Sequence, residues 1–115
     1  MKKLRVYIAG PYTSRDLEKR SENMRKAREI GTKIMQMGHY PYVPHTHTGT
    51  WEDSADIDYE AFMQLHFTIL EKWAEAMFFI DSSPGADRER AKAEQMGIPV
   101  FTTIEEFKDF TAKNL

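Results

Sequence analysis

The stretch Met77-Phe78-Phe79-Ile80-Asp81-Ser82-Ser83-Pro84-Gly85-Ala86-Asp87-Arg88-Glu89 decides the fold, because it joins an apolar strand to a helix through a tight turn. Its apolar start predicts a buried strand over residues 76–80, and the helix that follows is predicted over residues 84–96, before Gly97. A strand that ends in a Ser/Pro/Gly turn and opens a helix is where open α/β folds bind anionic ligands. Asp81, Ser82, Ser83 and Gly85 are therefore candidate ligand-binding residues.

Glu89 is the unusual residue of this predicted helix, because it falls on the stripe expected to face inward. At about 100° per residue, Ala86, Glu89 and Ala93 lie within roughly 80° of one another around the helix. Burying a carboxylate is costly unless it has a partner, so Glu89 is a candidate site residue. A nearby helix N-terminus favours the anion, which suits a nucleophile better than a general acid. Two alternatives stay open, a solvated helix residue and a capping partner for the Ser82/Ser83 region.

The rest of the chain continues the alternation of strands and helices. Strands are predicted at residues 4–9, 40–43 and 98–101, helices at residues 16–37, 57–75 and from 103 onward, and a polar loop at residues 44–55. This pattern predicts a single α/β domain over residues 1–115, with a parallel sheet and helices on both faces. A strand order of 2-1-3-4 brings the Gly10-Pro11 turn and the Pro84-Gly85 turn to the switch point, where such folds bind ligands.

Composition limits the classes of function. The chain has 115 residues, a net charge of −2 and no cysteine, so disulfides, thiolate catalysis and thiolate metal sites are excluded. A broad basic surface for a nucleic-acid polymer is not expected at this charge. No apolar run approaches the length of a membrane span, and the run after Met1-Lys2-Lys3 is too short for a signal peptide. We therefore expect a cytoplasmic protein with no membrane partner.

Further candidates follow the first two strands. Gly10 permits close backbone approach to a ligand, Pro11 completes the turn, and Arg15 offers donors to a phosphate or sugar. A plain strand-to-helix turn is the alternative. Tyr7, near the end of the first strand, needs a partner for its hydroxyl if that strand is central, and Glu89 is the candidate partner. A core tyrosine with its hydroxyl in water is the other interpretation.

Histidines supply the remaining candidates. His45, at the end of the second strand, is interpreted as a ligand contact or as a loop histidine in water. A metal-dependent hydrolase that uses His45 and His47 is a minor alternative, because two histidines with one residue between them are weak evidence for zinc. His66 lies on the apolar face of the helix predicted over residues 57–75. It is either a packed histidine or an acid/base group that faces the site.

These residues together resemble the nucleoside 2-deoxyribosyltransferase-like superfamily, which includes the 2′-deoxynucleoside 5′-phosphate N-hydrolases. The resemblance spans nearly the whole chain, and its spaced combination is more specific than any one motif. It is carried by Val6-Tyr7-Ile8-Ala9-Gly10-Pro11-Tyr12, by Asn23 and Ala27, by Gly38, Pro41 and Pro44-His45, and by Gly85-Ala86-Asp87-Arg88-Glu89 with Gly97-Ile98-Pro99-Val100.

The resemblance implies a flavodoxin-like or Rossmann-like sheet of four to five strands and cleavage of an N-glycosidic bond. Glu89 maps to the family's nucleophile, which forms a covalent glycosyl-enzyme, and Tyr7 maps to the tyrosine that orients it. Water then resolves the intermediate in a hydrolase, or another base resolves it in a transferase. The implied ligand is a nucleoside or nucleotide, no cofactor is implied, and a homodimer or higher homo-oligomer is expected.

The chain departs from the family pattern before the third strand. The aspartate that the family carries on the preceding helix falls at or next to His66, and Ala74-Glu75-Ala76 stands where another aspartate is often seen. Either His66 takes the proton-transfer role, or Asp58 or Glu60 reaches in, or catalysis is altered or absent. We therefore carry two hypotheses, an N-glycosidase or glycosyltransferase and a non-catalytic nucleotide-binding module of the same fold.

Overall fold

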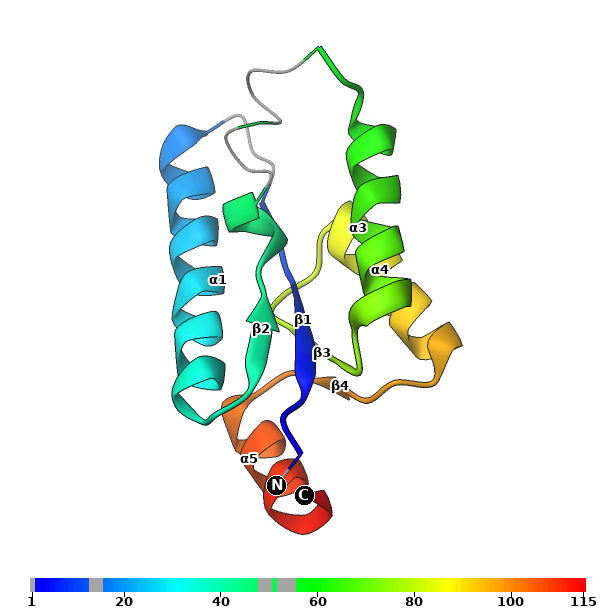
Figure 1. Ribbon diagram of the computed structural model, residues 1–115. Coiled ribbons are helices and arrows are strands. Elements are labelled where there is room, and N and C mark those ends of the chain that lie inside the picture. The colour runs from blue at the N-terminus through cyan, green and yellow to red at the C-terminus, as the bar shows by residue number, and fades with distance from the viewer. Residues whose placement is uncertain (1, 13–15, 48–50, 52–55) are drawn as a thin grey trace.

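A computed structural model describes residues 2–12, 16–47, 51 and 56–115. Its core is an all-parallel four-stranded sheet in the order β2-β1-β3-β4, which confirms the predicted 2-1-3-4 arrangement (Figure 1). The strands are β1 (Arg5–Ala9), β2 (Tyr40–Tyr42), β3 (Ala76–Phe79) and β4 (Val100–Phe101). The switch point therefore lies between β1 and β3, the two central strands.

Among the described residues, four long helices connect and flank these strands. They are α1 (Leu17–Gln36), α3 (Tyr59–Trp73), α4 (Pro84–Met96) and α5 (Ile104–Asn114). Polar side chains cap each start: Asp16, Asp58, Ser83 and Thr103 accept hydrogen bonds from backbone N–H groups of the first turns. Gly97 ends α4 in the left-handed conformation, with φ of 76°, which is where glycine is favoured.

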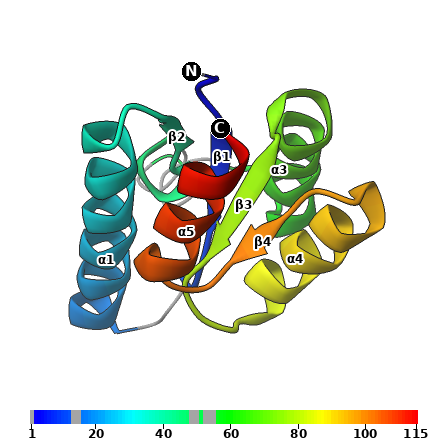
Figure 2. The ribbon, with the colours of Figure 1, turned by 90° about the horizontal axis from the view of Figure 1, so that it is seen from below.

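Successive side chains of β1 point to opposite faces of the sheet. Val6 and Ile8 pack on the face covered by α1 and α5, whereas Tyr7 and Ala9 pack on the face covered by α3 and α4. Figure 2 shows the resulting three layers, with the sheet between the two pairs of helices. The fold is thus the α/β architecture, compatible with a flavodoxin-like or Rossmann-like fold, that the sequence predicts.

The predicted boundaries differ from the observed ones by one or two residues at several ends, and the helix predicted over residues 57–75 spans only Tyr59–Trp73. The strand predicted at residues 98–101 contains only Val100 and Phe101, which pair with Met77 and Phe78 of β3 at the edge of the sheet. The polar loop predicted from residue 44 is wrong at its start, since residues 44–47 are helical. This helical turn places His45 within hydrogen-bonding distance of Gly10 and Pro11, which follow β1. None of the described helices is both long and apolar enough to cross a membrane.

Candidate functional site

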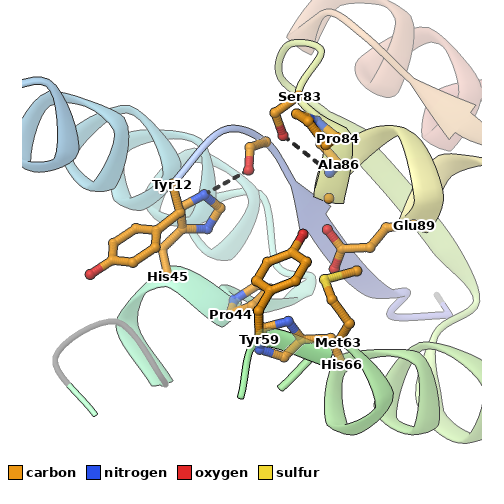
Figure 3. A pocket seen from close by; sticks show the side chains of 12 residues that line it. Tyr12, Pro44, His45, Tyr59, Met63, His66, Ser83, Pro84, Ala86 and Glu89 are labelled. Atoms are coloured by element: carbon orange, nitrogen blue, oxygen red, sulfur yellow. Dashed lines mark hydrogen bonds between the residues drawn. The ribbon is translucent and has the colours of Figure 1, made fainter. Parts of the chain in front are cut away.

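A cavity of about 340 Å³ lies at the carboxyl ends of β1 and β3, where the sequence places its candidate site. Figure 3 shows its walls, which come from the ends of β1 and β2, from one face of α3 and from the start of α4. The lining residues are Gly10, Tyr12, Pro44, His45, Tyr59, Met63, His66, Ser83, Pro84, Gly85, Ala86 and Glu89. Six of the predicted site residues are among them: Gly10, His45, His66, Ser83, Gly85 and Glu89.

Glu89 is the buried carboxylate of this cavity. Its side chain lies on the inward face of α4 and is only 6% exposed. The fully buried Tyr7 donates a hydrogen bond from its hydroxyl to Oε2 of Glu89. The predicted partnership between the two residues is therefore present, across the β1–β3 switch point. A partner of this kind offsets part of the cost of burying the carboxylate and fixes its orientation.

Tyr42 is half-buried and packs against this group, although the sequence did not single it out. Its ring lies 5.6 Å from that of Tyr7, centroid to centroid, at the end of β2. Burial, and then the negative charge of Glu89, raise the pKa of Tyr42 to about 12. The Tyr42 phenol therefore stays neutral near the Glu89 carboxylate.

The turn between β3 and α4 uses much of its hydrogen-bonding capacity internally. The Ser82 hydroxyl donates to both oxygens of Asp87, at 2.8 Å each, and the Ser82 N–H donates to Asp81 at 2.7 Å. Ser83 accepts from the N–H of Ala86 at 3.1 Å. Asp81 and Ser82 are exposed and do not line the cavity, so their predicted role in ligand binding has no support from this geometry.

His45 ties β2 to the turn after β1. Its Nε2 lies 3.1 Å from the carbonyl oxygens of both Gly10 and Pro11, so this nitrogen carries the proton and donates. Burial lowers the pKa of His45, which keeps the ring neutral. The buried Nδ1 then has no hydrogen-bond partner among the described residues. Of the other residues predicted at this turn, Pro11 contacts His45 through its carbonyl oxygen. Arg15 lies outside the described residues.

His66 faces the cavity from α3, where the resemblance places an aspartate. Its side chain is 8% exposed, and burial, followed by the neighbouring His45 and His47, lowers its pKa to about 4. At neutral pH the ring can therefore accept a proton but carries no extra proton to donate. The carboxylates proposed as substitutes are engaged elsewhere, because Asp58 caps α3 through Ala61 and Glu60 pairs with Arg88.

Sequence reasoning missed several lining residues, above all Tyr59 and Met63. Tyr59, Met63 and His66 are four and three residues apart, and all three line the cavity from one face of α3. That spacing was available as a signal, but it marks a face without showing what the face meets. Tyr12 also lines the cavity, and its ring packs edge-on against His45 with 5.7 Å between centroids.

The geometry of the described residues does not support a metal site at His45 and His47. Within residues 2–12, 16–47, 51 and 56–115, no three His, Asp or Glu side chains are placed to hold a metal ion together. His47 instead contacts the Tyr42 hydroxyl through Nδ1 at 2.5 Å. The predicted pair of His45 and His47 therefore separates into two different roles.

Comparison with known families places the chain in one of them. The family described as "Domain of unknown function (DUF7768)" matches residues 4–103, and the chain belongs to this family. No curated protein matches the chain. The matched range contains both cavity-forming turns and all four strands, so the site lies within the region that defines the family.

Proposed function

We propose that this member of the DUF7768 family cleaves or transfers the N-glycosidic bond of a nucleoside or (deoxy)nucleoside 5′-phosphate. One observation carries the proposal: the cavity holds a buried glutamate whose carboxylate is hydrogen-bonded by a buried tyrosine from the neighbouring strand. A structural role alone does not require a carboxylate at this position. A covalent glycosidase requires one that is ionised, oriented and open to the ligand.

In the proposed first step, Glu89 attacks the anomeric carbon of the sugar. A carboxylate oxygen bonds to C1′ while the bond from C1′ to the base nitrogen breaks, and the electron pair stays on the base. Tyr7 holds Oε2 by its hydrogen bond, which directs the carboxylate toward the ligand. Because Tyr7 is fully buried in β1, its hydroxyl has little freedom to leave this position.

In the proposed second step, water or another base releases the sugar from Glu89. His66 is neutral at neutral pH and lines the same cavity, so it is placed to accept the proton of an attacking water molecule, although its lowered pKa makes it a weak base. The role assigned to His66 is therefore that of a base. A neutral His66 does not supply the proton that the leaving base takes up, so another side chain must donate it.

The second candidate is a non-catalytic nucleotide-binding module. The observation that favours it is that Glu89 is the only carboxylate among the described lining residues, with a neutral histidine where the resemblance expects an aspartate. Such a module would keep the cavity and its affinity while the chemistry is lost. Saturable nucleotide binding without release of a base over long incubation would favour it.

The test is release of free base from a panel of deoxynucleosides and their 5′-phosphates. Wild type should turn over at least one member, and Glu89→Ala should lose at least about 10³-fold in rate. Glu94→Ala, on the exposed side of the same helix, is the matched control and should keep the wild-type rate. Equal base release by wild type and Glu89→Ala would end the nucleophile assignment. Light scattering on the same samples tests the proposed homo-oligomer.

A further inference from the structure

Tyr59 stands at the mouth of the cavity, and the mechanism above gives it no role. It is the first residue of α3, its side chain is 47% exposed, and it lines the cavity. Figure 3 shows its hydroxyl directed inward, toward the Glu89 carboxylate, with the ring forming the outer wall. The Tyr59 hydroxyl therefore enters the same cavity as the candidate nucleophile, where a bound ligand would contact both side chains.

Gly85 permits this position. A Cβ atom at Gly85 would lie 2.7 Å from the Tyr59 hydroxyl oxygen, closer than real contacts allow. Gly85 has no positive φ, so its backbone conformation does not require glycine. The absence of a side chain instead lets the phenol reach the first turn of α4. Glu89 lies four residues further along α4, which places it on the same side of that helix as Gly85.

A second contact fixes the start of α3 beside α4. Arg88 forms two hydrogen bonds with the Glu60 carboxylate, at 2.8 and 2.9 Å, and its guanidinium lies 5.2 Å from the centre of the Phe67 ring. Interactions with Glu60, and additionally with Tyr59, hold the pKa of Arg88 above its ordinary range. The Arg88 guanidinium is thus paired with Glu60 and also interacts with the neighbouring Tyr59, so its N–H groups can stabilise negative charge that develops on the phenol oxygen.

We propose that Tyr59 is the general acid that protonates the leaving base, an inference that rests on the proposed glycosidase function. As the bond from C1′ to the base nitrogen breaks, that nitrogen takes the proton of the Tyr59 hydroxyl, and the phenolate is stabilised by Arg88. When water attacks C1′ and frees Glu89, its proton passes to His66 and returns through solvent to the phenolate. Each cycle therefore ends with one water consumed and both side chains restored.

The experiment compares a poor leaving group with one that needs no proton. Wild type, Tyr59→Phe and Glu89→Ala are assayed with deoxyinosine and with 4-nitrophenyl 2-deoxyriboside, each with and without a 5′-phosphate. The nitrophenyl leaving group departs as a stable anion. Tyr59→Phe should lower kcat/KM for deoxyinosine about 100-fold and for the nitrophenyl substrate less than about threefold. Glu89→Ala should abolish both reactions. Tyr40→Phe removes an exposed hydroxyl from β2 and is the matched control, with both rates unchanged.

Each other outcome counts against the inference. Equal losses on both substrates would mean that Tyr59 only positions Glu89 or the sugar, and no loss on either would exclude any role for the hydroxyl. A Tyr59→Phe melting temperature well below that of Tyr40→Phe would show a structural role instead. If wild type releases no base from any deoxynucleoside or 5′-phosphate of the panel, or if Glu89→Ala remains active, the proposed function itself fails, and the assignment of Tyr59 falls with it.

Discussion

The two faces of the sheet differ in what they bury. The face covered by α1 and α5 encloses a cluster built from Val6, Ile8, Ala27, Ile34, Phe78 and Phe107, all apolar. The face covered by α3 and α4 shares the same strands but encloses Tyr7, Glu89 and His66 beside its apolar residues. One strand thus supplies Val6 and Ile8 to a packed core and Tyr7 to a candidate site.

This difference shows how the domain separates stability from chemistry. Buried polar groups are costly, so a small domain can tolerate them on one face only if the other is well packed. His39 is the buried histidine of the apolar face, and its Nδ1 accepts the Leu4 N–H at 3.0 Å, a purely structural contact. On the other face, the polar groups surround a cavity. The predictions below test this separation.

Removing Phe107 should have the largest effect on stability. The side chain is fully buried and packs against Phe101 and His39, with ring centroids 5.2 and 5.3 Å away. Phe107→Ala should cost about 3–5 kcal/mol of unfolding free energy, because it leaves a cavity in the apolar face. Denaturant titration measures this. The remaining folded protein should keep its rate of base release per molecule, and a parallel loss of rate would show that the two faces are coupled.

Acid should destabilise the domain through its buried neutral histidines. Since the pKa of folded His66 is about 4, below the ordinary 6.5, the unfolded chain binds more protons between these pH values. Unfolding free energy should therefore fall as pH drops from about 6.5 to 4, by up to about 3 kcal/mol from His66.

His39 contributes to this acid dependence in the same direction, because burial also lowers its pKa. His66→Asn should flatten the pH dependence of the unfolding free energy more than His39→Asn does, as followed by denaturant titration at several pH values. Equal effects would mean that the cavity face is no more acid-sensitive than the apolar face.

Tyr7→Phe should affect activity more than stability. It removes the hydrogen bond to Glu89 while keeping the ring that packs against Tyr42. We expect a loss of about 10- to 100-fold in kcat for base release, because the carboxylate is less well oriented. Steady-state kinetics and thermal melts of the same preparation check this. A large fall in melting temperature with unchanged kcat would reverse the assignment and make Tyr7 a core residue.

Gly85→Ala should have the smallest effect on activity, about a tenfold loss. The new Cβ would displace the Tyr59 hydroxyl, while alanine itself is well tolerated in a helix. Gly97→Ala is the control that should affect stability and not activity. Gly97 has φ of 76°, which strains an alanine, but open space surrounds it. That variant should lower the melting temperature and leave the rate per folded molecule unchanged. A rate of base release by Gly85→Ala equal to that of wild type would show that the contact with Tyr59 is not needed.

Much of this fold could be predicted because its signals are local. Apolar runs, helical spacing, the Ser83 cap and the stop at Gly97 all act within a few residues, so the limits of α4 follow from its own sequence. The inward position of Glu89 follows from helical spacing alone. Its partner Tyr7, 82 positions away, required the further assumption that β1 is central in the sheet.

The sequence by itself determined the alternation of elements, the two turns and a carboxylate on the inner stripe of α4. Only the tertiary structure decided that Asp81 and Ser82 turn away, that His66 is buried enough to stay neutral, and that Tyr59 reaches over Gly85. The physical reason is that local periodicity fixes which face a residue occupies. What that face meets depends on how α3 and α4 pack, through contacts such as Arg88 with Glu60, 28 positions apart.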